Sequence, residues 1–461
     1  MQISKEHDPG WGGTEGLKES PGLRILYIQY TNPGGYPPLE HSSRILAEAG
    51  WKALFLGTGA LGANVLALPA NPRIQVRRMP FCRSGWRQKP HYLAYCAWAL
   101  WTAIKWRPTW IYASDPLACP IALLLRWMPG VKLLYHEHDS PDMTAMKNLF
   151  GKLVRSARHA VARRAELCVL PSSKRLDRFQ SELGPVRNSL CVWNCPARCE
   201  TMEHPRPPAS ENIWVLYHGS IVRERIPPSV LEALTLLPDR VKLRVAGYET
   251  AGSAGYVAEL KSRAQALGID RRVEFPGAIP QRADLLGITS QSDIGLALMP
   301  LKPTDLNFES MAGASNKPFD YMACGLALLV SDLPDWRSMF GEPGYALSCN
   351  PDDPASIASA ISILVEHPGR MRAMGEKGRQ RILSEWNYED MFRPVLEHLS
   401  PRENMPPDGG RAPAIRNTSP AAAEVRAITG TTSRKPVDPA SGIADPVPGS
   451  VATSGIPSPS R

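Results

Sequence analysis

Short apolar runs rich in strand-forming residues alternate with helical patterns along almost the whole chain. The run at 23–28 is followed by the turn Asn32-Pro33-Gly34-Gly35 and by a helical pattern over 39–49. A strand, a glycine turn and a helix in this order open a βαβ unit. The same alternation continues through strand-like runs at 53–56, 74–76, 110–112, 132–135, 167–170 and 189–193, with helical patterns at 91–106, 117–128 and 147–165. It predicts a parallel sheet that is covered by helices on both faces.

A second series of the same kind follows the proline-rich segment 196–211, which we interpret as an interdomain linker. We therefore expect an α/β chain with two Rossmann-like, doubly wound domains, 23–195 and 212–385, that face each other across a cleft. Segment 386–400 is expected to be a C-terminal helix that crosses back to the first domain. The expected strands of the second domain are 213–217, 242–246, 273–275, 294–298, 326–330 and 345–347, and its expected helices are 228–237, 255–267, 316–323, 354–366 and 369–384.

The two ends of the chain have a composition unlike that of the domains. Residues 1–22 are rich in Gly, Glu and Lys, and residues 401–461 are rich in proline and contain no Phe, Trp or Tyr. Segments with so little apolar content cannot build a packed core. We expect a disordered leader at 1–22 and a disordered tail at 401–461.

The formal net charge of the 461 residues is +9. A basic chain of this kind favours an anionic substrate or an anionic membrane surface as partner. The nine cysteines are an odd number scattered through the sequence, which indicates reduced thiols and a cytoplasmic location. The amino end lacks the apolar stretch of a signal peptide, and the longest charge-free apolar run, Tyr92–Ile104, is too short to span a bilayer. We expect a cytoplasmic protein, with a peripheral contact at the inner face of the membrane left open.

The helix predicted at 316–323 begins with polar and charged residues, Asn316 and Lys317, and carries Asp320 one turn later. A helix amino terminus offers unpaired backbone N–H groups and a partial positive charge, which suit a phosphate. Lys317 would add a cation, and Asp320 would accept hydrogen bonds from ribose hydroxyls. The alternative is that Asp320 only favours the helix start and that Lys317 is a solvated surface charge.

The first strand of the second domain ends in the sequence Tyr217-His218-Gly219-Ser220, and Arg225 follows five residues later. A glycine after a strand lets a ligand approach the backbone closely, and an arginine neutralises a diphosphate through bidentate contacts. Gly247, after the next strand, is a second glycine of this kind. An ordinary surface loop is the alternative interpretation.

The strand 132–135 ends in the polar cluster His136-Glu137-His138-Asp139. Doubly wound folds bind ligands at the carboxyl ends of their strands. Metal binding, a buried structural histidine and contact with a substrate are the three interpretations. Metal binding is the weakest, because side chains in so short a run point apart and no i, i+4 histidine pair exists.

The sequence predicts neither a metal nor a cofactor. Cys191, Cys195, Cys199 and His204 form the one metal-like cluster, but their spacings are not those of paired CxxC ligands. The sequence has no Asp-x-Asp motif that could bridge a metal to a diphosphate. Any nucleotide-sugar would be a substrate rather than a cofactor.

These motifs resemble those of the group 1 (family 4-like) glycosyltransferases, and the resemblance covers most of residues 23–400. It implies the GT-B fold, with a nucleotide-diphosphate sugar held mainly by the second domain, and metal-independent transfer with retention at the anomeric carbon. Asp320 occupies the place of a ribose-binding glutamate, and Arg225 that of a diphosphate-binding lysine. His138 would touch the transferred sugar, with Glu137 and Asp139 as its orienting partners.

The resemblance also implies that Gly34 and Gly35 lie near the donor phosphate and the acceptor. Three positions depart from the family pattern: Asp320, one methylene shorter than the usual glutamate; Ser220, where many relatives have arginine; and Ala312, where many have a second glutamate. The expected catalytic residues are His138 and Arg225. The expected substrate-binding residues are Gly34, Gly35, Glu137, Asp139, His218, Gly219, Ser220, Gly247, Asn316, Lys317 and Asp320.

The helical pattern 147–165 is amphipathic, with an apolar side and several lysines and arginines elsewhere. It either packs on the sheet with a solvated basic face or contacts anionic lipid headgroups near a lipid-linked acceptor. Trp98, Trp101 and Trp106 would add interfacial anchors or belong to a buried helix. No nucleic-acid recognition motif accompanies the basic charge, so a nucleic-acid partner is not expected.

We therefore expect a glycosyltransferase that moves a sugar from a nucleotide-diphosphate sugar to a glycan or lipid-linked acceptor. A nucleotide-sugar epimerase on the same scaffold is one alternative. A nucleotide-sugar-binding protein that has lost catalysis is the other, and Ala312, Ser220 and the change from glutamate to Asp320 are the features that suggest it.

Overall fold

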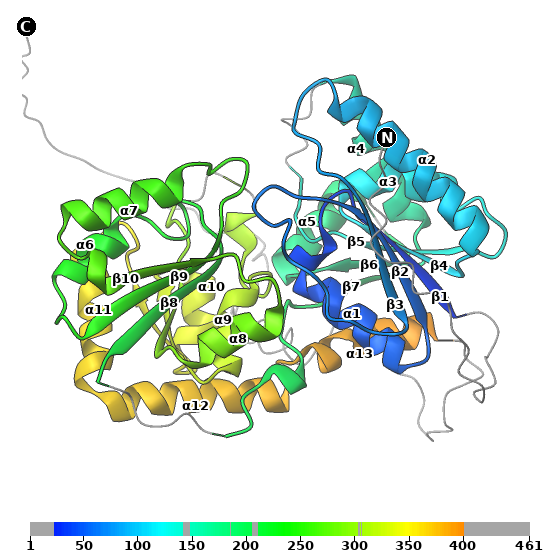
Figure 1. Ribbon diagram of the computed structural model, residues 1–461. Helices are drawn as coiled ribbons and strands as arrows, with labels where there is room; N and C mark the ends of the chain where they lie inside the picture. The colour runs from blue at the N-terminus through cyan, green and yellow to red at the C-terminus, as the bar shows by residue number, and fades with distance from the viewer. Residues whose placement is uncertain are drawn as a thin grey trace, which may run out of the picture.

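The computed structural model describes residues 23–141, 148–184, 186–204, 211–302, 305 and 307–400. These residues form two α/β bodies that lie side by side, each built on a twisted sheet of parallel strands (Figure 1). The predicted class, two doubly wound domains, is confirmed. The predicted leader at 1–22 and tail at 401–461 lie outside the described residues.

The first domain contains a seven-stranded sheet in the order β3-β2-β1-β4-β5-β6-β7. All neighbouring strands pair in parallel. The strand order reverses between β1 and β4, which is where doubly wound sheets open a crevice for ligands. The strands are β1 Arg24–Ile28, β2 Lys52–Thr58, β3 Ile74–Met79, β4 Trp110–Ser114, β5 Lys132–His136, β6 Leu167–Leu170 and β7 Ser189–Cys191.

Alternate residues of β1 and β2 separate two cores, because successive side chains in a strand point to opposite faces. Ile25 and Tyr27 pack with α1 and α13 on one face, whereas Leu26 and Ile28 pack with α2, α3, α4 and α5 on the other. The helices are α1 Pro37–Glu48, α2 Gln88–Trp106, α3 Cys119–Leu125, α4 Leu149–Arg164 and α5 Ser173–Leu183.

The second domain contains a six-stranded parallel sheet in the order β10-β9-β8-β11-β12-β13, which reverses between β8 and β11. Helices again cover both faces. The strands are β8 Ile213–Ser220, β9 Val241–Tyr248, β10 Val273–Gly277, β11 Ile294–Ala297, β12 Ala327–Ser331 and β13 Ala346–Cys349. The helices are α6 Ser229–Thr235, α7 Tyr256–Ala266, α8 Arg282–Ser290, α9 Asn316–Ala323, α10 Pro334–Trp336, α11 Pro354–Glu366 and α12 Pro368–Ser384.

The last described helix, α13 (Tyr388–Leu399), leaves the second domain and lies against α1 of the first (Figure 1). The side chain of Asn387 caps it by accepting a hydrogen bond from the N–H of Asp390. Tyr388 packs against His41, and Arg44 pairs with Glu389 at 2.8 Å. The chain therefore joins the two domains twice, through the segment after β7 and through α13.

Sequence patterns did not predict α5 and α8. Helix α5 has a serine cap, Ser172, and ends at Gly184, but its polar composition hides the apolar face formed by Leu176 and Phe179. Helix α8 is short and contains Gly287, a residue that disfavours helix. No described helix combines the length and apolar character needed to cross a membrane.

Candidate functional site

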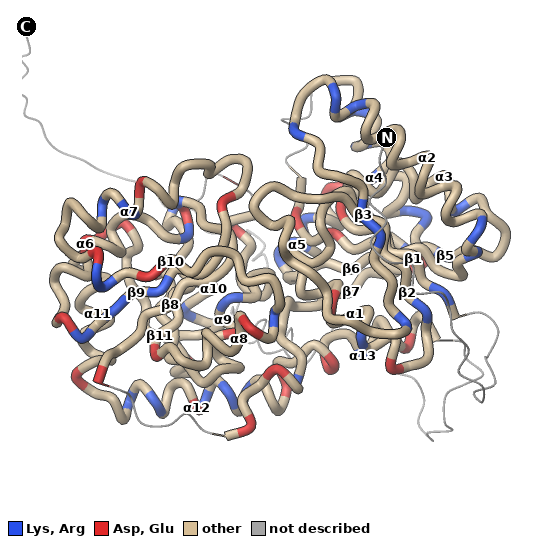
Figure 2. Tube along the Cα trace, viewed as in Figure 1, with Lys and Arg blue, Asp and Glu red and all other residues tan. Residues whose placement is uncertain are grey.

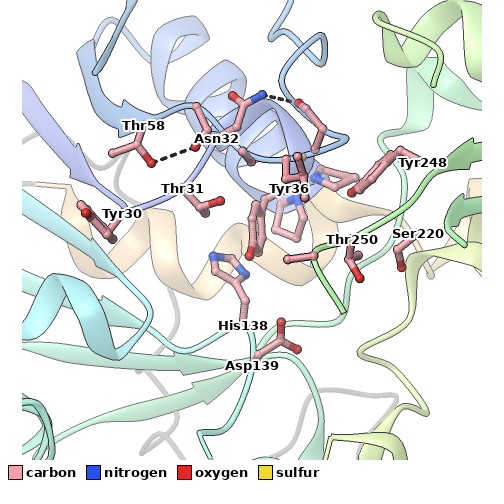
Figure 3. A pocket seen from close by; sticks show the side chains of 18 of the residues that line it. Tyr30, Thr31, Asn32, Tyr36, Thr58, His138, Asp139, Ser220, Tyr248 and Thr250 are labelled. Carbon is pink, nitrogen blue, oxygen red and sulfur yellow. Dashed lines mark hydrogen bonds between the residues drawn. The ribbon is translucent and has the colours of Figure 1, made fainter. Parts of the chain in front are cut away.

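A cavity of about 460 Å³ lies between the two domains, at the carboxyl ends of the central strands of both sheets. Tyr36 and His138 reach into it from the first domain, and Ser220 and Thr250 reach into it from the second (Figure 3). Arg225, Asn316 and Lys317 also line it. The cavity thus lies where the two strand orders reverse and face each other, which is the expected ligand position for this architecture.

A second cavity of about 180 Å³ adjoins the first. Both are lined by Ser220, Arg225, Asn316 and Lys317, so these four polar residues mark the junction between them. The rest of the smaller cavity comes from both domains: Gly34, Gly35, Pro37, Glu40, Leu66 and Ala67 on one side, and His218, Gly219, Ala246, Gly247, Tyr248, Ile279, Pro280, Arg282 and Leu285 on the other.

Two cations lie at this junction. Arg225 donates a hydrogen bond from Nη1 to the Ser220 hydroxyl at 2.9 Å, which fixes the guanidinium at the end of β8. Lys317 is almost fully buried beside the ring of Tyr217. Burial and the positive charge of Arg225 lower the pKa of Lys317 well below its usual range. An anion bound here would relieve that repulsion and favour the charged ammonium.

Helix α9 begins at the same junction. Its N-cap residue, Ser315, makes no capping hydrogen bond, and the buried Ser315 hydroxyl has no partner among the described residues. Ser315 and Asn316 both line the larger cavity. An uncapped helix start with a free hydroxyl can donate hydrogen bonds to a phosphate.

Gly219 and Gly247, the next-to-last residues of β8 and β9, are required by the backbone geometry. Gly219 and Gly247 pair across the strands and both have a positive φ, 105° and 158°. A Cβ on Gly247 would come within 1.8 Å of the carbonyl oxygen of Gly219. Their close approach forms the wall of the smaller cavity. Gly34 is constrained in the same way, since its Cβ would lie 2.6 Å from the carbonyl oxygen of Leu66.

His138 lies at the wall of the larger cavity and is almost fully buried. Its Nε2 lies 3.3 Å from the Ser114 hydroxyl, and its ring packs against those of Tyr36 and His136. Its Nδ1 is buried and has no hydrogen-bond partner within the described part of the chain. Burial lowers the pKa of His138 to about 4, and the repulsion from Arg175 adds to this effect, while Asp139 opposes it.

We expect the His138 imidazole to stay neutral in the free protein above about pH 5, because its pKa of about 4 lies well below the ordinary value of about 6.5. The folded state therefore binds this proton less readily than the unfolded chain, so His138 reduces stability as the pH falls from about 6.5 toward 4. Histidine NMR spectra measured against pH, with His138→Gln to assign the signal, check this. A midpoint near pH 6.5 would contradict it.

Asp115, which the sequence did not single out, holds the loop that carries His138. Its carboxylate accepts the backbone N–H groups of His138 at 2.8 Å and of Asp139 at 3.3 Å. It is one of the two non-glycine residues with positive φ in the described part of the chain, at 64°. Burial, together with the charge of Asp139, raises the pKa of Asp115 to about 7. A strained residue at the end of β4 thus positions the cavity wall.

Glu137, expected to be an orienting partner of His138, makes its hydrogen bonds to other residues. Glu137 is fully buried on the opposite side of the strand and lines neither cavity. It receives two hydrogen bonds from Arg158, at 2.6 and 2.9 Å, and one from the Tyr135 hydroxyl. The reason is the alternation of side chains in extended backbone, which sends 137 and 138 to opposite faces. Asp139, by contrast, is exposed and lines the larger cavity.

Asp320 is also placed differently from the expectation of a ribose contact. Its carboxylate is fully buried, lines neither cavity and is bound by the Arg282 guanidinium at 2.6 and 3.2 Å. Asn316 donates a third hydrogen bond to it at 3.0 Å. Burial raises the pKa of Asp320, and Arg282 offsets only part of this effect. In this structure Arg282, rather than Asp320, faces the smaller cavity.

Arg282 joins Asp320 to the segment predicted to be a linker. Glu200 in that segment pairs with Arg282 at 2.6 Å and with His41 of α1 at 3.0 Å. Burial alone would raise the pKa of Glu200, but Arg282 and His41 hold it well below its usual range. This buried network, Glu200, Arg282, Asp320 and His41, connects both domains behind the smaller cavity. The segment 196–204 is therefore part of the packed interface rather than a solvated spacer.

Further contacts join the domains beside the larger cavity. The Asn307 side chain exchanges two hydrogen bonds with the backbone of Ser140, at 2.8 and 3.1 Å. The buried Arg175 donates to the carbonyl oxygens of His138 and Asn307. Arg175 and Asn307 were not found from the sequence, since neither belongs to a recognisable motif. Tyr36 and Tyr248 were missed too, although each directly follows a predicted glycine turn.

The metal-like cysteine cluster is not assembled. Among the described residues, which include Cys191, Cys195, Cys199 and His204, no group of three or more His, Cys, Asp or Glu side chains could hold a metal ion. None of the described cysteines forms a disulfide.

Two family models match the two domains. The model described as "Glycosyl transferase 4-like domain" matches residues 38–194, and the one described as "Glycosyl transferase-like" matches residues 223–397. The chain is also similar to glycogen synthase of Mycobacterium tuberculosis, with 21% identity over 442 residues, covering 86% of this chain and all of that protein.

Solved glycosyltransferases share the fold. Sucrose-phosphate synthase from Thermosynechococcus elongatus superposes with a TM-score of 0.61 at 16% identity, covering 81% of this chain and 98% of the other. Anabaena HepE in complex with UDP and glucose gives 0.61 at 17% identity, covering 82% and 99%. WaaG, a glycosyltransferase involved in lipopolysaccharide biosynthesis, gives 0.57 at 12% identity, covering 80% and 98%. At these identities the likeness establishes the fold.

Proposed function

Since the chain belongs to the group 1 glycosyltransferases of GT-B fold, we propose that it moves a sugar from a nucleotide-diphosphate sugar to a glycan or lipid-linked acceptor. The observation that carries this proposal is the junction of the two cavities. Arg225, Lys317 and the free amino end of α9 meet there, between a larger and a smaller space. A diphosphate at the junction would direct its sugar into one cavity and its nucleoside into the other.

The junction could also stabilise the charge that develops in the transition state of the transfer reaction. Negative charge develops on the diphosphate as it leaves, and fixed donors aimed at that charge lower the barrier. Arg225 and Lys317 are cations held by burial and hydrogen bonds, and Ser315 and Ser220 add hydroxyls. This donor set of cations, hydroxyls and backbone N–H groups suits metal-independent transfer.

The sugar would lie in the larger cavity beside His138. A neutral imidazole held by Ser114 can donate or accept one hydrogen bond to a sugar hydroxyl, and the Tyr36 ring next to it offers an apolar face. We assign His138 to positioning the sugar for transfer with retention, with Asp139 at the mouth of the same cavity. The similar proteins whose structures contain UDP or UDP-glucose make a uridine nucleotide the first donor to test.

Binding of a nucleoside diphosphate is expected to raise the melting temperature, because a ligand at about 100 times its Kd stabilises the folded state by about 2.7 kcal/mol. For domains of this size that corresponds to roughly 5–10 °C. The measurement is thermal unfolding with a panel of nucleoside diphosphates and their sugars, with and without EDTA. Stabilisation that disappears in EDTA would contradict a metal-independent site, and the absence of any stabilisation would contradict the donor site.

Product analysis with the same donors separates the rival functions. Release of nucleoside diphosphate that depends on an acceptor supports transfer. Conversion of the donor to an isomeric nucleotide-sugar would instead support an epimerase, and stabilisation without any product would support a binding protein.

A further inference from the structure

Helix α2 exposes a stripe of apolar side chains on the side that faces away from the domain core. The inward side of the helix buries Tyr95, Ala99 and Ala103. The outward side carries Leu93, Trp101 and Ile104, whose exposed fractions are 68%, 53% and 56%, together with the exposed Ala97. Spacings of four, four and three residues place these four side chains on one line along the helix. Soluble surfaces rarely keep so many apolar side chains together without a partner.

The stripe continues onto the neighbouring helices. Helix α3 contacts both α2 and α4, so the three form one layer over the sheet. Leu124 and Trp127, at and just after the end of α3, are 57% and 85% exposed. Leu149 and Leu153, one turn apart at the start of α4, are 84% and 56% exposed. We call these seven residues, with Ala97, the apolar face: Leu93, Ala97, Trp101, Ile104, Leu124, Trp127, Leu149 and Leu153.

The charged side chains on the three helices that carry the apolar face are all basic or histidine. The sequence contains no Asp or Glu between Glu48 and Asp115, and none within α2, α3 or α4. Lysine and arginine lie at both ends of α2 (Figure 2). The Lys105 ammonium stands 4.0 Å from the Trp101 ring centre. The exposed cations of this layer are Lys89, Lys105, Arg107, Lys152, Arg163 and Arg164.

We propose that the apolar face docks on an anionic lipid bilayer. Leucine, isoleucine and tryptophan enter the boundary between headgroups and acyl chains, while lysine and arginine around them attract anionic headgroups. A nucleic acid would use the cations but would gain nothing from exposed Leu93, Ile104 or Leu153. Trp98 and Trp106 are partly buried against the core, so Trp101 and Trp127 are the aromatic anchors.

The docking surface begins beside the cleft. Gln88 and His91, in the first turn of α2, line the larger cavity, and so does Phe81 just before the helix. An acceptor anchored in the bilayer would therefore reach the cavity along the start of α2. Docking itself is independent of the proposed function, whereas the inference that the acceptor is lipid-linked rests on it.

The test is sedimentation of the full chain with vesicles of phosphatidylcholine alone or with added phosphatidylglycerol, at low and high salt. We expect the chain to bind the anionic vesicles. Its affinity should be at least tenfold weaker for neutral vesicles, or for anionic vesicles at high salt. Two variants test the apolar and the basic component separately. The first combines Trp101→Gln with Ile104→Gln, and the second combines Lys152→Gln, Arg163→Gln and Arg164→Gln. The matched control, Leu236→Gln with Lys261→Gln, changes an exposed leucine and lysine of the second domain.

Each of the two variants should weaken vesicle binding at least tenfold, while the control binds like the unchanged chain. All changed side chains are exposed, so the melting temperature and its increase with nucleoside diphosphate should stay the same, which separates this test from that of the donor site. Equal binding by all forms, or no binding, would overturn the proposal. So would RNA binding that needs the cations but not Trp101 and Ile104, or a dimer that the Trp101 and Ile104 changes dissociate.

Discussion

Replacing Arg225 with alanine is expected to lower kcat/KM for sugar transfer about 100- to 1,000-fold, the usual cost of losing one preorganised donor to a developing anion. Arg225 is the half-buried cation at the junction of the two cavities, held there by the Ser220 hydroxyl. Its Nε is buried without a partner in the described residues, which leaves it available to an oxygen of the diphosphate. Steady-state kinetics with donor varied at fixed acceptor measure the effect.

Arg223 provides the matched control, two residues earlier in the same loop. It is exposed, pairs with Glu259 on the surface and lines neither cavity. Arg223→Ala should keep kcat/KM within about twofold, since exposed ion pairs contribute little. Both variants should melt within about 2 °C of the unchanged protein. Near-normal transfer by Arg225→Ala, at saturating and subsaturating donor, would remove its assigned role.

Replacing Arg282 with methionine is expected to lower the melting temperature by about 10 °C, because breaking a buried ion pair costs about 3–5 kcal/mol. The Arg282 guanidinium lies between the carboxylates of Glu200 and Asp320 and contacts both at 2.6 Å. Its loss leaves two acids close together, one of them fully buried. Calorimetry near pH 7 measures the change.

The deficit of Arg282→Met should shrink as the pH falls toward 5. Without the cation, the folded-state pKa of both carboxyls lies above the unfolded value, so the variant gains stability as the pH falls. Adding Glu200→Gln and Asp320→Asn should recover part of the loss. Arg263→Met, which breaks the surface pair with Glu232, is the control and should cost less than about 1 kcal/mol. If Arg282→Met also cost less than about 1 kcal/mol, the buried network would not be needed for the stability of the protein.

The alternation of strands and helices was sufficient to predict the two-domain fold. Apolar runs such as 23–28 and 213–217 are typical of strands that are buried on both faces of a parallel sheet. Such runs can be recognised from neighbouring residues in the sequence alone. Helices α5 and α8 were not predicted. The apolar pattern of α5 is masked by its many polar residues, and that of α8 is interrupted by Gly287.

The candidate site was predictable only where it follows strand ends. Gly34, His138, Ser220 and Lys317 all lie at the cleft, because topology brings the carboxyl ends of parallel strands together. The direction of a side chain depends on its tertiary partner, which the sequence does not reveal. Glu137 binds Arg158, which is 21 positions later in the sequence. Asp320 binds Arg282, which is 38 positions earlier.

The buried network behind the smaller cavity has a consequence for donor binding. Arg282 lines that cavity while also holding Glu200 and Asp320, and Asn316 at the start of α9 binds Asp320 as well. The helix start that faces the diphosphate is therefore fixed by the same charges that join the two domains. A site held in this way needs little reorganisation when the leaving group develops its charge.

The measurement that bears most directly on the central claim is NMR observation of the donor during turnover in EDTA. With a nucleotide-diphosphate sugar and an acceptor extract, we expect the nucleoside diphosphate to appear together with a product whose anomeric proton keeps the donor's configuration. Arg225→Ala should slow the appearance of both signals about 100- to 1,000-fold at subsaturating donor. An intact donor, an isomerised nucleotide-sugar, an inverted anomeric signal or a reaction that stops in EDTA would contradict retaining, metal-independent transfer at this cleft.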